Sequence, residues 1–373
     1  MNFLFTCGGT AGHINPAIGV ADRLKEIFPD ANFLFVGAEG MMETELVPRE
    51  GYEIKTVKVT NLQRSLSPAG IKHNLGTVKN VISSLREAKK IIREFKPDVA
   101  VGTGGYVCYP VLKAANALGV PTLVHESNAV PGLTTKLLSK TVDCVMLGFE
   151  GAKSNYKPGV NTVYTGTPVR PEFTTLTKPE AKRALGYPAD KPLVLSVWGS
   201  LGSAFMNGIM TDFIRLAAEK EDFFLVHSAG KRGYAGMKAA LDEKCADFAE
   251  RGMDVREYIY DMPRVMAAAD VILCRSGAST IGELTALGRP TVFVPSPNVT
   301  GNHQEKNARV LEKCGAAVVL LEGEFTAEQL YERVTGLLAD RGRLEVMSDA
   351  MRAAGKADAT EKIAELVLGT IKH

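Results

Sequence analysis

The sequence predicts an α/β protein with two doubly wound domains, each built around a parallel sheet. Short apolar runs alternate with longer amphipathic stretches, a pattern typical of parallel strands covered by helices on both faces. At 373 residues the chain is long for a single core, so about two domains are expected. Residues 170–192, rich in Pro, Thr and Lys and without a strand pattern, separate the runs into two sets. We expect a ligand cleft between the domains, where strand ends and helix starts converge.

Each set of apolar runs supplies the strands of one domain. In the first set the expected strands cover residues 3–6, 32–36, 98–101, 122–125, 143–147 and 162–165. In the second set they cover residues 193–197, 223–227, 255–258, 270–274, 291–294 and 316–320. Both sets open with a strand, a glycine-rich turn and a helix, which is a weak internal repeat. The expected domains are residues 1–168, residues 169–345, and terminal helices over residues 346–373 that could pack back on the first domain.

Composition and charge exclude several classes of protein. The formal net charge of +2 argues against a dedicated nucleic-acid binder. The charge is uneven, because residues 64–96 hold eight basic and two acidic side chains. The six cysteines are scattered and form no C-x-x-C pair, which predicts buried free thiols in a reducing cytosol rather than a disulfide scaffold or a zinc site. No apolar run approaches the roughly 20 residues that a membrane-spanning helix needs.

The turn Arg275–Glu283 (RSGASTIGE) is the most informative motif. It follows an expected buried strand and precedes an apolar-periodic stretch, Ile281–Leu287, that predicts a helix. Small residues let backbone N–H groups approach a ligand, and a helix start favours anions. Glu283, expected in the first helical turn, can accept two hydrogen bonds from the hydroxyls of a ribose. The alternative is an ordinary strand-to-helix turn in which Glu283 complements the helix dipole.

A second glycine-rich turn, Gly8–Ala17 (GGTAGHINPA), follows the first strand. Its glycines are not spaced as in a P-loop or a G-x-G-x-x-G motif, but such a turn can still cradle a diphosphate through backbone N–H groups. His13 is the only titratable residue of the turn, and histidine is the usual general base near neutral pH. Either His13 acts as a base on a reacting hydroxyl, or it only caps the loop.

Three further turns follow expected strands. Gly102–Val107 can bring the backbone close to a ligand or to another loop. Within His125–Gly132, Asn128 can hydrogen-bond to a sugar, whereas Glu126 is expected to hold the loop together. Arg170 ends the last turn of the first set, where it is either a phosphate clamp or a salt-bridged boundary residue.

A polar cluster, Gly301–Ala308 (GNHQEKNA), precedes a helix. Its amide and imidazole side chains suit sugar hydroxyls, and they equally suit a well-capped helix start. The chain contains no D-x-D triplet and no G-x-S-x-G motif, which argues against a metal–diphosphate site and a serine hydrolase. We therefore expect no metal and no cofactor.

Seven of these segments, in this order, resemble the motifs of one family, the bacterial lipid I N-acetylglucosaminyltransferases (MurG). They are GGTAGHINPA, GTGGYV, HESNAVPG, GTPVR, GSLGS, RSGASTIGE and GNHQEKNA, and they span nearly the whole chain. The resemblance implies a GT-B fold, with an N-terminal acceptor and membrane-facing domain and a C-terminal UDP-GlcNAc-binding domain. It also implies inverting transfer of GlcNAc from UDP-GlcNAc to the C4 hydroxyl of the muramyl sugar in lipid I, giving lipid II.

The resemblance also implies roles for matching residues. His13 matches the candidate base, and Glu283 would hold the ribose hydroxyls. Ile259 would meet the uracil through its backbone, Ser200 would bind the diphosphate, and Gln304 would contact the GlcNAc hydroxyls. The residues expected to contact UDP-GlcNAc or to complete the acceptor contacts are Thr10, Ala11, Gly12, Asn128, Arg170, Ser200, Gly202, Ser203, Ile259, Ala278, Ser279, Thr280, Ile281, Gly282, Glu283, Gln304 and Asn307.

Five positions differ from the usual family pattern. Ala11 replaces a common glycine, Ser127 a common glutamine and Thr167 a frequent asparagine. Trp198 and Leu201 replace the usual Gly and Gln of the second domain's glycine-rich loop, where the diphosphate would bind. Trp198 and Leu201 alter the loop where the phosphate contacts would form, without changing the expected fold.

Residues 71–95 combine apolar side chains with lysines and could lie on an anionic membrane surface. The alternative is an ordinary amphipathic helix packed on the sheet.

The expected partners are UDP-GlcNAc, lipid I, the cytoplasmic leaflet of the cell membrane, and proteins of cell-wall synthesis or division. Competing functions are a UDP-GlcNAc 2-epimerase, a transferase with a diacylglycerol acceptor, and a non-enzymatic UDP-sugar-binding scaffold. The expected membrane contact of residues 71–95 rests on Ile71, Lys72, Leu75, Val78, Lys79, Ile82, Leu85, Lys89 and Lys90.

Overall fold

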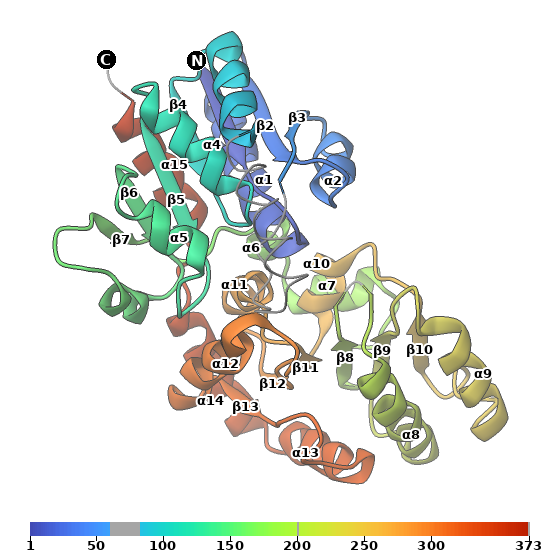
Figure 1. Ribbon diagram of the computed structural model, residues 1–373. Coiled ribbons are helices and arrows are strands. Elements are labelled where there is room, and N and C mark those ends of the chain that lie inside the picture. Colours follow the sequence, from blue (N-terminus) through green and yellow to red (C-terminus); the bar gives the residue numbers. More distant parts are fainter. Residues whose placement is uncertain (60–82, 200, 372–373) are drawn as a thin grey trace, which may run out of the picture. The chain divides into compact units, whose positions relative to one another are not determined.

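The computed structural model describes residues 1–59, 83–199 and 201–371. Contacts divide the chain into two compact units (Figure 1). Unit 1 comprises residues 1–170 together with residues 358–373, and unit 2 comprises residues 171–357. Each unit has its own sheet and its own hydrophobic core.

The described part of unit 1 contains a seven-stranded parallel sheet in the order β3-β2-β1-β4-β5-β6-β7. The expected strands of the first set all form. The additional strand, β3, lies at the edge of the sheet and is only partly buried, so it shows no continuous apolar run. The strands are β1 (Asn2–Thr6), β2 (Asn32–Ala38), β3 (Glu53–Val57), β4 (Val99–Gly102), β5 (Thr122–Glu126), β6 (Cys144–Leu147) and β7 (Thr162–Tyr164).

Helices cover the sheet of unit 1. The last helix, drawn in red in Figure 1, packs on α1 although more than 330 residues separate them, with Arg23 of α1 hydrogen-bonded to Glu361 (|i−j| = 338). Lys362 donates to the carbonyl of Tyr164 at 2.7 Å. Residues 83–95 are also helical. The other helices are α1 (Ala11–Ile27), α2 (Glu43–Arg49), α4 (Cys108–Ala117), α5 (Leu133–Leu138), the 3₁₀ helix η1 (Glu150–Asn155) and α15 (Ala359–Thr370).

Unit 2 repeats the plan with a six-stranded parallel sheet, in the order β10-β9-β8-β11-β12-β13, among its described residues. The prediction of two doubly wound parallel sheets is thus confirmed. Its strands are β8 (Leu193–Val197), β9 (Phe224–Ser228), β10 (Met253–Arg256), β11 (Val271–Cys274), β12 (Thr291–Phe293) and β13 (Ala317–Val319). Its helices are α6 (Glu172–Thr175), α7 (Lys178–Ala184), α8 (Ala204–Lys220), α9 (Tyr234–Lys244), α10 (Met262–Ala268), α11 (Ala278–Leu287), η2 (Thr300–Asn302), α12 (His303–Lys313), α13 (Ala327–Ala339) and α14 (Arg341–Ala354).

The strand order reverses between β1 and β4 in unit 1, and between β8 and β11 in unit 2. In open α/β sheets, ligands bind beyond the carboxyl ends of the strands at such a point. The loops that follow these four strands carry four of the glycine-rich or small-residue motifs of the sequence. The fold thus selects the same segments as candidate binding loops.

A charge cluster around Asp270, the residue before β11, ties the start of β8 to α7. Asp270 is bound by Lys178 at 2.7 Å, by Lys182 at 2.8 Å and by the N–H of Leu193 at 2.9 Å. Burial alone would raise the pKa of the Asp270 carboxyl, but these three donors outweigh it and hold the pKa below its ordinary value. The carboxylate therefore contributes stability above the unfolded pKa of about 3.9, and the contribution is lost as pH falls through the lower folded pKa.

We expect D270N to destabilise unit 2 by about 3 kcal/mol at pH 7, because Lys182 is left with a buried, unpaired charge. The difference from the unsubstituted protein should shrink as pH falls below about 4. Urea unfolding followed by Trp198, the single tryptophan, reports on unit 2. D349N is the matched control, since the Asp349 side chain is 83% exposed. A D270N penalty that is equal at pH 7 and pH 3 would contradict this explanation.

Among the described residues, no helix is long and apolar enough to cross a membrane. Residues 71–82 of the segment proposed to lie on a membrane fall outside the described residues; they include Ile71, Lys72, Leu75, Val78, Lys79 and Ile82. Within the described helix 83–95, Leu85 and Lys89 are half-buried and Lys90 is exposed.

Candidate functional site

In unit 1 the glycine-rich loops after β1 and β4 touch each other. The N–H of Gly8 donates to the carbonyl of Gly104 at 3.1 Å. A Cβ at Gly105, where φ is +93°, would overlap the backbone of Gly8. Glycine is therefore needed for this close approach as well as for the backbone conformation. The glycine-rich motifs Gly8–Ala17 and Gly102–Val107 therefore lie side by side.

His13 lies in the first turn of α1, against the loop that follows β4. A Cβ at Gly104 would come within 2.5 Å of the imidazole ring. His13 Nδ1 lies 2.9 Å from the carbonyl oxygen of Gly8. A carbonyl oxygen only accepts hydrogen bonds, so this contact assigns the proton to Nδ1. In the neutral ring Nε2 then keeps its lone pair, which is the state that a general base requires.

The backbone around His13 is also fixed. The N–H of His13 donates to the Thr10 carbonyl at 3.0 Å, and Thr103 Oγ1 donates to the His13 carbonyl at 2.6 Å. Thr10 is the exposed N-cap of α1, and Ala11 and Gly12 are partly exposed first-turn residues. The structure thus brings Thr10, Ala11, Gly12 and His13 together at one helix start.

The loop after β5 has mainly a structural role. His125 is buried, donates from Nε2 to the Gly166 carbonyl at 2.9 Å and accepts from Ser127 Oγ at 3.0 Å through Nδ1. Burial lowers the pKa of His125, so its ring is neutral. Glu126 accepts hydrogen bonds from the backbone and the side-chain amide of Asn128, at 3.1 and 3.0 Å, and from the backbone of Gly132.

This geometry agrees with a loop-holding role for Glu126, and the hydrogen bonds of His125 likewise join it to neighbouring loops. Asn128 is partly buried, with its amide nitrogen turned toward Glu126. Arg170 is the last residue of the first segment of unit 1 and is partly buried. Asn128 lies in the loop between β5 and α5, and Arg170 lies in the loop between β7 and α6.

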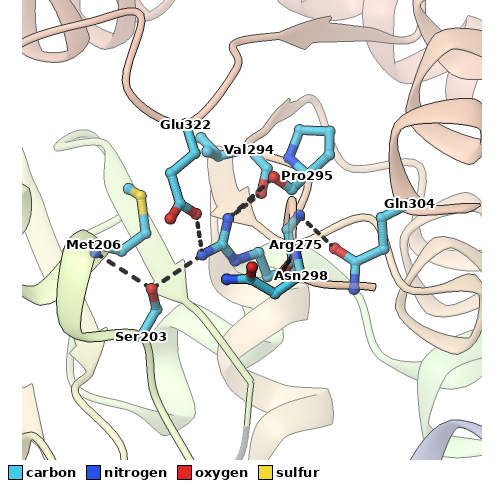
Figure 2. A network of polar contacts seen from close by, with 9 residues as sticks. Ser203, Met206, Arg275, Val294, Pro295, Asn298, Gln304 and Glu322 are labelled. Carbon is cyan, nitrogen blue, oxygen red and sulfur yellow. Dashed lines mark hydrogen bonds and ion pairs between the residues drawn. The ribbon is translucent and has the colours of Figure 1, made fainter. Parts of the chain in front are cut away.

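In unit 2, Arg275 joins the loops that follow β8, β11, β12 and β13 (Figure 2). Its guanidinium donates to the carbonyls of Val294 and Pro295 at 2.9 and 3.2 Å, and to Ser203 Oγ at 3.0 Å. It also forms an ion pair with Glu322, and both side chains are at least 85% buried. Arg275 thereby fixes the position of the loop ends on which the donor site would be built.

Ser203 is the N-cap of the long helix α8. Its Oγ accepts from the N–H of Met206 at 3.3 Å while it accepts from Arg275. Gly202 has φ of +77°, and a Cβ there would overlap the carbonyl of Ala229. An N-terminal cap on a 17-residue helix is a suitable anchor for a diphosphate. The predicted contact Ser200 lies outside the described residues.

Trp198, which departs from the family pattern, is buried in this loop. Its indole N–H donates to Ser196 Oγ at 2.9 Å, and Ser196 is also bonded to the buried His227 at 3.0 Å. The Arg275 guanidinium carbon lies 5.7 Å from the Trp198 ring centroid. The indole therefore supports the guanidinium from one side. Leu201, the other departure, is 52% exposed.

The helix after β11 starts earlier than the sequence pattern indicated. α11 begins at Ala278, so Glu283 is its sixth residue and lies in the second turn, not in the first as predicted. The prediction was wrong because the small residues before Ile281 show no apolar period although they are helical. Glu283 is partly exposed. The other predicted positions in this helix are Ala278, Ile281 and Gly282, which are buried, and Ser279 and Thr280, which are partly exposed.

Gln304 and Asn307 lie on α12 and are bound to neighbouring loops. Gln304 Oε1 accepts from the N–H of Ser296 at 2.8 Å (Figure 2), and its carbonyl accepts from Ser276 Oγ at 2.8 Å. The side-chain nitrogen of Gln304 takes no part in these bonds, and the side chain is partly exposed. Asn307 is fully buried and donates to the Ser276 carbonyl at 3.3 Å. Gln304 thus has a donor group to offer, whereas Asn307 holds the loop of Ser276.

Ile259 lies between β10 and α10 with its side chain buried. Its neighbours Tyr258 and Tyr260 are 38% and 84% exposed, and their rings pack edge to face with centroids 4.9 Å apart. A buried side chain leaves only the backbone of Ile259 for a ligand, as the predicted uracil contact requires.

Sequence reasoning missed two buried carboxylates. Glu322 follows β13 and pairs with Arg275. Glu43, the first residue of α2, is fully buried and accepts hydrogen bonds from the N–H groups of Gly9 and Ala38. Neither glutamate stands in a glycine-rich motif. Their partners are far away in sequence or on the backbone, so no local pattern marks them.

Comparison with known proteins places the whole chain in one group. Residues 3–147 match the glycosyltransferase family 28 N-terminal domain, and residues 193–363 match the glycosyltransferase family 28 C-terminal domain. The chain is 43% identical to a protein of Acetivibrio thermocellus over 100% of this chain and 99% of the relative. A protein of Thermoanaerobacter sp. is 43% identical over 98% of this chain and 99% of its own length. Both relatives are named UDP-N-acetylglucosamine–N-acetylmuramyl-(pentapeptide) pyrophosphoryl-undecaprenol N-acetylglucosamine transferase.

Solved structures of similar fold match the chain over nearly its full length. The crystal structure of Acinetobacter baumannii MurG matches with a TM-score of 0.74 and 25% identity, covering 99% of each chain. A UDP-GlcNAc 2-epimerase from Neisseria meningitidis, bound to UDP-GlcNAc, matches with a TM-score of 0.67 and 16% identity over 99% of this chain and 100% of the epimerase. The epimerase match shows the fold alone.

Proposed function

The chain belongs to glycosyltransferase family 28, and we propose that it transfers GlcNAc from UDP-GlcNAc to N-acetylmuramyl-(pentapeptide) pyrophosphoryl-undecaprenol, the lipid I of peptidoglycan synthesis. It has the GT-B fold of that family, with two Rossmann-like parallel sheets. The observation that carries the proposal is the 43% identity, over the full length, to transferases that bear this activity in their names. The product is lipid II.

The chemistry assigned to unit 1 is proton removal from the acceptor. The C4 hydroxyl of the muramyl sugar attacks the anomeric carbon of GlcNAc, and its proton passes to His13 Nε2. As the new C–O bond forms, the bond from the anomeric carbon to the diphosphate breaks on the opposite face, and UDP leaves. The tautomer set by the Gly8 carbonyl supports His13 in this role.

The chemistry assigned to unit 2 is donor binding and stabilisation of the leaving diphosphate. The capped start of α8, with Ser203 held by Arg275, offers main-chain N–H groups and a favourable helix dipole to the diphosphate. Donors fixed before the reaction stabilise developing charge more effectively than mobile ones. We assign Glu283 to the ribose hydroxyls, Gln304 to GlcNAc and the backbone of Ile259 to uracil.

A transfer assay tests the proposal. The purified protein is incubated with radiolabelled UDP-GlcNAc, with and without a lipid I analogue, in buffer containing EDTA. We expect label to enter the lipid only when the acceptor is present, and we expect EDTA to leave the rate unchanged. Consumption of UDP-GlcNAc without acceptor would instead support an epimerase, whose fold this chain shares.

The lipid acceptor and the basic excess of residues 64–96 support peripheral binding to the cytoplasmic leaflet. We expect the protein to sediment with vesicles that contain anionic lipid. Raising the salt concentration from about 0.1 M to about 1 M shortens the Debye length from about 10 to about 3 Å and should release the protein. Equal sedimentation with neutral vesicles, or binding that salt does not change, would exclude an electrostatic membrane contact.

A further inference from the structure

The peptide group between Gly8 and Gly9 is held on both sides. Its N–H donates to Glu43 Oε2 at 3.0 Å, and its carbonyl oxygen accepts from His13 Nδ1 at 2.9 Å. The two bonds belong to one rigid, planar unit. A single peptide therefore connects the carboxylate of Glu43 to the imidazole of His13.

Glu43 is placed for this contact by the packing around it. The side chain is fully buried, and its other oxygen, Oε1, accepts from the N–H of Ala38 at 2.8 Å. A Cβ at Gly8 would overlap that oxygen, and a Cβ at Gly37 would come within 2.5 Å of Glu43 Cγ. Two glycines thus leave the space that the carboxylate fills, and both of its oxygens are bound to main-chain donors.

Two buried thiols, Cys7 and Cys108, lie near Glu43. Burial raises the pKa of Cys7 well above its ordinary value, and burial together with the charge of Glu43 raises that of Cys108 to about 12. The single S–H of Cys108 is shared between the carbonyls of Thr6 and Gly104, which lie 3.1 and 3.0 Å from Sγ. Both thiols are therefore neutral near pH 7 and do not compete with His13 as bases.

We propose that Glu43 is a positioning residue for His13 and acts through the Gly8–Gly9 peptide. The inference rests on the proposed function of His13 as the base. A charged acceptor on the N–H side polarises the peptide and makes its carbonyl a stronger acceptor for Nδ1–H. This fixes the ring orientation and keeps the proton on Nδ1, so Nε2 stays available. In the Ser-His-Asp triad a carboxylate that is hydrogen-bonded directly to the histidine fixes the tautomer and orientation of the ring in the same way.

The substitution E43Q tests the proposal. Glutamine offers one oxygen and one NH₂ group, so either Gly9 or Ala38 would face a donor instead of an acceptor. We expect kcat to fall about a hundredfold, the effect of a small misplacement of a reacting group, with KM for UDP-GlcNAc unchanged. E43D keeps the charge and should recover part of the loss. E45Q is the matched control, because Glu45 lies two residues away and is exposed.

A spectroscopic measurement separates positioning from general loss of structure. In the full-length protein labelled with ¹⁵N-histidine, we expect the neutral His13 ring to carry its proton on Nδ1, and we expect E43Q to shift it toward Nε2. Unsubstituted protein with the proton on Nε2 would overturn the proposal, even if E43Q did not fold. So would E43Q with unchanged kcat and tautomer, provided that H13A is inactive. If H13A keeps full turnover, the base assignment itself fails.

Discussion

Replacing His13 with asparagine is expected to lower kcat about 10²–10⁴-fold, the usual contribution of a general base. The side-chain amide of asparagine can still donate to the Gly8 carbonyl, as Nδ1 does at 2.9 Å. It has no group at the position of Nε2, so the loop is kept while the base is lost. Because His13 itself is assigned no contact with the donor, the affinity for UDP-GlcNAc should not change.

Single-turnover transfer and calorimetric titration with UDP-GlcNAc measure the two effects separately. H13Q serves as the paired variant, since its longer side chain reaches toward the position of Nε2 but cannot take a proton. Both variants should be inactive and both should bind the donor. Full turnover by H13N would remove His13 from the mechanism and leave it as a cap of the loop.

Replacing Arg275 with methionine is expected to have the second largest effect, on donor binding and on stability together. Glu322 would be left as a buried, unpaired carboxylate, and breaking such a pair costs about 3–5 kcal/mol. Ser203 would also lose its donor at 3.0 Å, which frees the start of α8. We therefore expect KM for UDP-GlcNAc to rise at least about tenfold, equivalent to about 1.4 kcal/mol.

A double variant distinguishes the two effects of Arg275. R275M combined with E322L removes both charges, so most of the lost stability should return, while donor binding should stay weak. Urea unfolding and UDP-GlcNAc titration are the measurements. R309M is the matched control, because Arg309 also pairs with glutamates but is 39% exposed. Normal donor binding by R275M would show that Arg275 does not organise this site.

The fold was predictable because buried parallel strands appear as short apolar runs. β3 could not be found this way, because an edge strand with exposed positions has no such run. The start of α11 was misplaced for a related reason. Ala278, Ser279 and Thr280 carry no apolar period, and their helical conformation depends on the turn at Gly277, which a local pattern does not reveal.

The candidate site could be predicted where a motif carries the chemistry locally, and the roles of His13 and Ser203 stay predictions of this kind. Residues that act through distant partners could not be predicted. Glu43 contacts Gly9 across 34 positions, and Glu322 reaches Arg275 across the ends of β11 and β13. The tautomer of His13 also depends on folding, since it follows from the position of one carbonyl oxygen.

The linkage in the purified product is the most direct test of the central claim, inverting transfer to the muramyl C4 hydroxyl. The protein is incubated with UDP-GlcNAc and a lipid I analogue, and the disaccharide is examined by NMR. We predict a β-linked GlcNAc, seen as a large coupling between its H1 and H2, and a long-range correlation from its anomeric proton to muramyl C4. An α-linked product, attachment at another hydroxyl, or free GlcNAc or an epimer as the only product would contradict the claim.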